Sequence, residues 1–138
     1  MTVNYTAEEV IINAKSTVPK LIEQSYTVHR DILKSKLQSS LSKIHFSINM
    51  WTSPNHRSFQ AIVAHFIEAE TRQSRKALLA LPELPSHGGE DQATAFLLTA
   101  ESYGILDKIG YICGDNHGSN DKMCRFISTG LQAKGRPY

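Results

Sequence analysis

The chain has 138 residues, of which 41% are apolar and 20% charged, and a formal net charge of +2. These values are typical of one globular domain, and so small a charge does not by itself indicate a nucleic-acid or membrane partner. No apolar run approaches a membrane span, the N-terminus lacks the apolar region of a signal peptide, and two cysteines cannot form a disulfide framework. We therefore expect an intracellular protein with reduced thiols and no membrane association.

Helical patterns occupy the first part of the chain. The spacing of Thr6 and Glu9 is that of a capping box, which predicts a short helix over 7–15. A second helix is predicted over 19–41 because apolar residues recur every three or four positions. Its stripe is formed by Ile22, Tyr26, His29, Leu33, Leu37 and Leu41. We treat residues 1–42 as an N-terminal helical segment.

Three strand patterns with short connections follow. Residues 44–50 alternate apolar and polar side chains and end in the turn chemistry of WTSPN. Residues 58–67 are apolar on both faces in their middle, which is typical of a central strand. Residues 75–81 form a third strand, although Ala and Leu also favour helix. The short turns between them predict an antiparallel meander.

A helix, a strand and a second helix complete the pattern. Residues 90–103 are predicted to be helical, with Gly104 as the C-terminal glycine. Residues 108–113 form a short apolar strand, and a last helix over 121–129 ends at Gly130. A strand, helix and strand in this order predict a crossover to a parallel fourth strand.

Two polar residues lie at strand ends and are candidate site residues. Asn49 comes late on the polar face of the first strand, and Asp115 opens the loop after the fourth. The pattern alone favours a solvent-facing Asn49, because polar sheet faces are common. For Asp115 it leaves two readings open, a turn or cap and a site at the end of a parallel strand.

Other polar and aromatic residues carry weaker signals. Trp51 is expected to be a core or boundary residue. Cys113 and His117 lie four apart across a loop, but a structural role is favoured over a zinc site. The basic residues at 56–57 and 72–76 are expected to be solvated surface, with DNA contact as the alternative. No residue is assigned to nucleic-acid binding.

Five segments carry a family resemblance when they are taken together and in order. They are KIHFSINMWTSPN (43–55), IVAHFIE (62–68), LPELPSHGGEDQA (81–93), YGILDKIGYICGDNHGSND (103–121) and the Met-Cys at 123–124. In this order they resemble the catalytic core of hAT-superfamily transposases, especially the fungal type, over roughly residues 17–130. The resemblance implies a ribonuclease-H-like fold that cuts and joins DNA with three acidic residues and Mg²⁺ or Mn²⁺, in the nucleus.

The resemblance also assigns roles to the two candidate residues. The family's first catalytic Asp, in an Asp-hydrophobic-Trp-Thr-Ser motif, falls on Asn49, whereas the second falls on Asp115. The third acid, a Glu, lies downstream of Tyr138. Mg²⁺ prefers anionic oxygen ligands, and two-metal phosphoryl transfer needs several of them. The resemblance therefore implies that Asp115 is a vestigial metal ligand and that metal is not bound productively.

We expect an α/β, ribonuclease-H-like fold, truncated, with three antiparallel strands, a parallel fourth strand and flanking helices. Residues 43–130 would form the partial core and residues 131–138 a tail. The expected function is a degenerate or truncated catalytic-core fragment of an hAT-type transposase without independent DNA cleavage or strand transfer. The alternative is a protein-interaction module that pairs, or self-associates, through an exposed sheet edge at 108–113.

Overall fold

The computed structural model describes residues 17–114 and 119–135 and divides the chain into two units, Met1–Ser35 and Lys36–Tyr138. The described part of the first unit is helix α2, Thr17–Gln38, whose last turn belongs to the second unit. The helix predicted over 7–15 lies outside the described residues.

Helix α2 ends three residues before the predicted position. A serine-rich turn follows Gln38, in which the Ser40 hydroxyl donates to the Ser42 carbonyl (2.9 Å) and accepts from the Ser42 N–H (3.3 Å). Serine hydroxyls that bond to nearby backbone groups compete with helical hydrogen bonds. Leu41 therefore lies beyond the helix and is 60% exposed, so its place on the predicted stripe was wrong.

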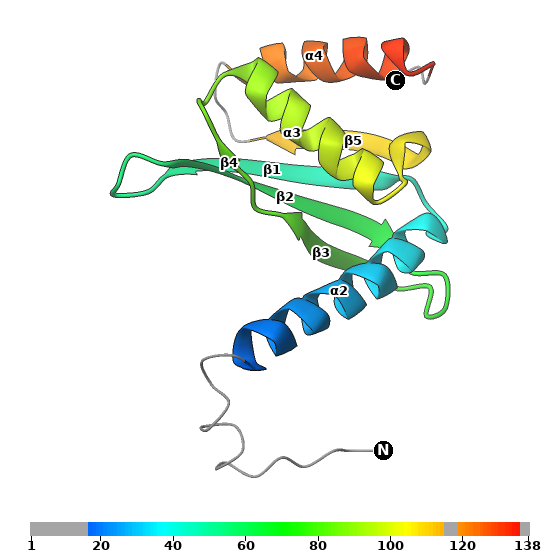
Figure 1. Cartoon of the computed structure of the whole chain (residues 1–138). Helices are drawn as coiled ribbons and strands as arrows, with labels where there is room; N and C mark the ends of the chain where they lie inside the picture. The colour runs from blue at the N-terminus through cyan, green and yellow to red at the C-terminus, as the bar shows by residue number, and fades with distance from the viewer. Residues whose placement is uncertain (1–16, 115–118, 136–138) are drawn as a thin grey trace. The chain divides into compact units, whose positions relative to one another are not determined.

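One mixed sheet forms the centre of the second unit (Figure 1). Its strands are β1 Ile44–Thr52, β2 Ser58–Ile67, β3 Ser74–Ala80, β4 Glu83–Leu84 and β5 Ile109–Gly114. The order is β3-β2-β1-β5, with β4 also paired to β2. Strands β1, β2 and β3 form the predicted antiparallel meander, and β5 runs parallel to β1 as predicted. The two-residue strand β4 was not predicted.

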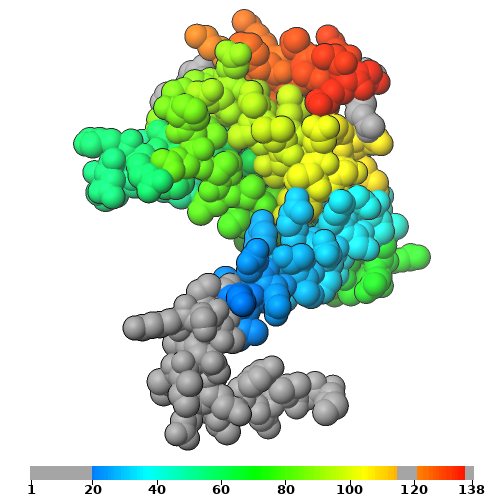
Figure 2. Space-filling model, in the orientation of Figure 1, coloured from blue at the N-terminus to red at the C-terminus, as the bar shows by residue number. Residues whose placement is uncertain are grey.

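Two helices lie on one face of this sheet. Helix α3, Gly89–Ser102, contacts β1 and β2, and α4, Ser119–Ala133, lies against α3 (Figure 1). A one-turn 3-10 helix, η1 Leu106–Lys108, precedes β5. Gly104 adopts φ +68° just after α3, which confirms its predicted role as the C-terminal glycine. In Figure 2 the β1–β2 hairpin projects past these helices.

The predicted end of the last helix at Gly130 was wrong, because α4 continues to Ala133. A Cβ at Gly130 would lie 2.4 Å from Leu97 Cδ1 on α3. The glycine therefore allows the two helices to approach closely and does not terminate one. Leu131, predicted to lie in a tail, is 2% exposed and belongs to the core.

The core lies between the sheet and the helices. Phe46 on β1 meets Phe96 on α3 edge-to-face, with ring centroids 4.8 Å apart. Strands β1 and β2 each present alternate side chains to this layer, as their period-two patterns predict. The buried members are Ile44, Phe46, Ile48, Gln60, Ile62, Ala64 and Phe66 from the strands, and Phe96, Met123, Ile127 and Leu131 from the helices.

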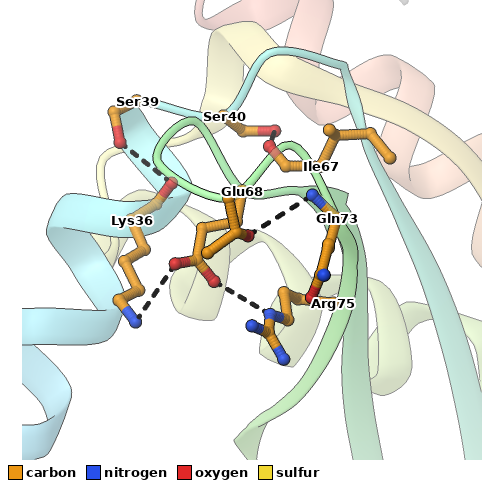
Figure 3. Close-up of polar contacts among 8 residues, drawn as sticks. Lys36, Ser39, Ser40, Ile67, Glu68, Gln73 and Arg75 are labelled. Atoms are coloured by element: carbon orange, nitrogen blue, oxygen red, sulfur yellow. Dashed lines mark hydrogen bonds and ion pairs between the residues drawn. The ribbon is translucent and has the colours of Figure 1, made fainter.

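A buried carboxylate fixes the last turn of α2 to the β2–β3 hairpin (Figure 3). The Glu68 side chain is 7% exposed and lies between Lys36 and Arg75. Lys36 Nζ is 3.6 Å from one carboxylate oxygen, and Arg75 Nε donates to the other at 3.0 Å. Two cations compensate the desolvation of this anion, as a buried charge requires.

Candidate functional site

The parallel pairing of β1 and β5 places the backbones of the two candidate segments side by side. Ser47 pairs with Cys113, and Ile48 pairs with Gly114. Asn49 follows directly after Ile48, and Gly114 is the last described residue of its strand. Asp115 lies outside the described residues. The structure therefore confirms the strand pair on which the site was predicted, and the position of the acid stays a prediction.

Asn49 lies on the sheet face opposite the helices. Its neighbour Ile48 is buried toward α3, so strand alternation turns Asn49 to the other face, where it is exposed and opposite Ala61 of β2. Its side chain is a neutral amide with one carbonyl oxygen as acceptor. The position is accessible to a ligand but carries no charge.

Two histidines and their partners occupy the same face. His45 and His65 are opposite each other on β1 and β2. Ser47 Oγ lies 2.8 Å from His65 Nε2, and His45 Nδ1 accepts the Tyr111 N–H at 2.9 Å. The His45 ring also stacks on Tyr111, with centroids 5.4 Å apart. These contacts engage one ring nitrogen of each histidine.

A glycine makes the His45 arrangement possible. A Cβ on Gly110 would lie 2.5 Å from His45 Nδ1, a distance that real Cβ atoms do not show. The sequence did not reveal this contact, because it depends on the register between β1 and β5. The only available signal was the alternation that places His45 on the polar face.

The end of β1 is held by aromatic stacking and one hydrogen bond. Trp51 is 41% exposed and stacks on Phe59, with centroids 5.8 Å apart, so the expectation of a core or boundary residue was wrong. Thr52 Oγ1 lies 2.7 Å from His87 Nε2 in the loop before α3. His87 thus makes a structural contact, as the two histidines on the open face do.

Two of the basic residues considered for DNA contact have acidic partners within the chain. Arg57 Nε donates to Glu83 at 2.7 Å, and a second guanidinium nitrogen contacts the other carboxylate oxygen. This pairing raises the pKa of Arg57 and lowers the pKa of Glu83. Arg75 is bound by Glu68. Both cations are therefore partly neutralised, which weakens the case for a phosphate-binding patch.

The donor groups of the site do not fit a divalent metal in the described part of the chain. No three His, Cys, Asp or Glu residues there lie close enough to hold an ion. Strand β1 offers the Asn49 amide oxygen, whereas Mg²⁺ and Mn²⁺ favour carboxylates. The described residues thus provide no anionic ligand at the position where the resemblance implies one.

A hollow of about 550 Å³ lies where α3 begins, on the other side of the sheet from Asn49. Its lining comprises Ser86, Gly88, Gly89, Glu90, Asp91, Lys122, Arg125 and Phe126. Its lining has two acidic and two basic side chains, so it favours neither an anionic nor a cationic ligand. Gly89 serves packing here, because a Cβ would lie 2.6 Å from Lys122 Cβ.

Comparisons with known proteins assign the chain to a family. Residues 47–136, more than half of the chain, match the model of the ZBED1 RNase-like domain. A protein of Talaromyces stipitatus, described as "Putative transcriptional regulator tpeD", is 25% identical over 124 residues. The alignment covers 89% of this chain and 14% of that protein, so the chain spans only a small part of its relative. None of the described helices is long and apolar enough to cross a membrane.

Proposed function

Because the chain belongs to the ZBED1 RNase-like domain family, we propose that it is a transposase-related catalytic-core fragment of the hAT type without DNA cleavage or strand transfer of its own. One observation carries this proposal. Asn49 occupies the β1 position, next to the pairing of Ile48 with Gly114, where the family resemblance places the first catalytic Asp. From the family membership we also propose DNA as the partner and the nucleus as the location.

The chemistry of phosphoryl transfer explains why this residue matters. Two divalent ions about 3.5–4 Å apart activate the nucleophile and stabilise the leaving oxygen, and carboxylates hold the two ions. An Asp offers two charged oxygens that bridge ions, whereas the amide of Asn49 offers one neutral oxygen. Asp115, the second acid that the resemblance implies, does not replace that bridge. Mg²⁺ or Mn²⁺ is therefore not bound productively in this proposal.

A plasmid-nicking assay in Mg²⁺ and in Mn²⁺ tests the proposal. The wild-type chain and Asp115→Ala should give the same background of nicked plasmid. Nicking by the wild type that is lost in Asp115→Ala would overturn the proposal, because it would require a working metal site. Nicking that persists equally in both would be a contaminant and agrees with it.

A second candidate function is pairing with another strand at the edge of the sheet. Strand β5 is last in the strand order, and within the described ranges no strand pairs with its outer edge. Tyr111 on this strand is 81% exposed. Uncovered strand edges recruit other chains through their backbone groups. Hydrogen exchange at high and low protein concentration tests this: edge pairing should slow exchange within 109–114, and unchanged rates would exclude it.

A further inference from the structure

Helix α2 has one apolar half between Leu21 and Leu33. At 3.6 residues per turn, two adjacent rows of side chains fall on this half. They comprise Leu21, Ile22, Ser25, Tyr26, Val28, His29, Ile32 and Leu33. The opposite half carries Lys20, Glu23, Gln24, Thr27, Arg30, Asp31, Lys34 and Ser35. Such a clean division predicts that the apolar half is buried against a partner surface.

Much of this apolar half is accessible in the described structure. Ile22 is 64% exposed, Tyr26 62% and Val28 56%. Leu21, Ile22, Ser25, Tyr26 and His29 border a shallow groove of about 480 Å³. Single exposed apolar residues are normal, but a contiguous patch of this kind marks an interaction surface.

The spacing within the patch is that of a two-helix seam. Ile22, Tyr26, His29 and Leu33 follow one another at intervals of four, three and four residues. This is the alternation that lets a helix pack its knobs into the holes of a second helix. A helix partner therefore fits this surface better than a sheet or an irregular loop does.

The charges that border the seam select the identity and direction of the partner helix. Glu23 and Arg30 lie seven residues apart and therefore occupy equivalent positions along one border. In an antiparallel pair of identical helices, Ile22 meets Leu33 of the second copy and Tyr26 meets His29. This register places Glu23 opposite Arg30 of the second copy, and symmetry repeats the pair at the other end.

A parallel pair would not use these charges. In a parallel pair, the seam border that carries Glu23 and Arg30 faces the opposite border of the partner's seam. In this helix the opposite border carries Ser25 and Ile32, which have no charge. Charge complementarity thus favours the antiparallel arrangement. We propose that α2 forms an antiparallel pair with α2 of a second copy of this chain, and that two reciprocal Glu23–Arg30 pairs set its direction.

The pair should be weak and reversible. A helix of 22 residues is about 33 Å long, and a contact of this length buries less than the roughly 1,600 Å² of a standard interface. Exposed ion pairs each contribute little, but reversing one charge replaces two attractions with two repulsions. We expect a dissociation constant in the micromolar range and about a tenfold increase for each single charge reversal.

Sedimentation equilibrium of the full chain over a concentration series tests the proposal. Wild type should approach twice the monomer mass, Glu23→Arg and Arg30→Glu should each dissociate about tenfold more readily, and the double exchange should restore wild-type association. Lys20→Glu is the matched control, because it reverses a charge on the polar half away from the seam and should leave association unchanged.

Circular dichroism of each variant establishes that α2 remains helical. Should a charge variant lose helix, Tyr26→Ser replaces it, because this change removes a seam residue and should abolish association. A wild-type chain that stays monomeric at all concentrations would overturn the proposal, whether or not its apolar half is covered within the chain. Failure of the double exchange to restore association would overturn the antiparallel register. Association that is insensitive to Glu23→Arg, Arg30→Glu and Tyr26→Ser, as association through β5 would be, would also overturn the proposal.

Discussion

The substitution Asn49→Asp probes the proposed loss of metal binding directly. Asn49 is exposed on β1, so a new carboxylate needs no buried partner and should change the free energy of unfolding by less than about 0.5 kcal/mol. A divalent ion and a unit charge 4 Å apart attract by about 2 kcal/mol in water and about 8 kcal/mol at the effective dielectric of a protein surface. These energies correspond to affinity gains of about 30-fold and about a millionfold.

The exposure of Asn49 favours the lower end of this range, and we expect Mn²⁺ to bind about 30-fold more tightly to Asn49→Asp than to wild type. Isothermal titration with Mn²⁺ at low ionic strength measures the change. Asn55→Asp is the matched control, because it makes the same amide-to-acid change at an exposed position in the β1–β2 turn. An unchanged affinity, or a gain that persists when Asp115→Ala is added, would refute the reasoning.

Three further predictions concern the framework of the site. Gly130→Ala should stabilise the chain by less than the roughly 1 kcal/mol of helix propensity, because the end of the Leu97 side chain must move aside. In a Leu97→Ala background the same change should give the full gain in urea unfolding, and an equal gain in both backgrounds would contradict the contact. Phe46→Ala should cost about 3–5 kcal/mol in the same assay, and a loss below 1 kcal/mol would contradict its place in the core. The hydrogen bond from Arg57 lowers the pKa of Glu83 below 4.5, so the stabilisation from this ion pair is present above that pH and lost as the pH falls through the folded-state pKa. The difference in unfolding free energy between wild type and Arg57→Ala should therefore become smaller on acidification. A difference that does not change with pH would argue against the pair.

Local patterns predicted most of the secondary structure. Strand β2 begins and ends where its alternation indicated, and Gly104 terminates α3 because only a glycine adopts its positive φ without strain. Gly130 carried a similar signal but lies within α4. Gly104 adopts a positive φ after its helix, whereas Gly130 is helical and has Leu97 of another helix in the space that a side chain would need. Sequence position alone could not distinguish the two.

The candidate site also has some features that the sequence predicts and others that it does not. The alternation of β1 is enough to place Asn49 on the polar face, and the absence of a negative charge there is a property of the residue itself. The sequence also determines the amphipathic character of α2 and the spacing of its charges. These features depend on intervals of a few residues, which the geometry of strands and helices converts directly into faces.

Only the tertiary structure decided which groups meet across the sheet. The pairing of Ile48 with Gly114, the hydrogen bond from Tyr111 to His45, and the ion pair of Arg57 with Glu83 all join residues far apart in the chain. Each depends on strand order and register, which long-range packing of the core selects and which no local pattern encodes. The sequence by itself thus determined what chemistry the residues carry, and the folded sheet decided which of them act together.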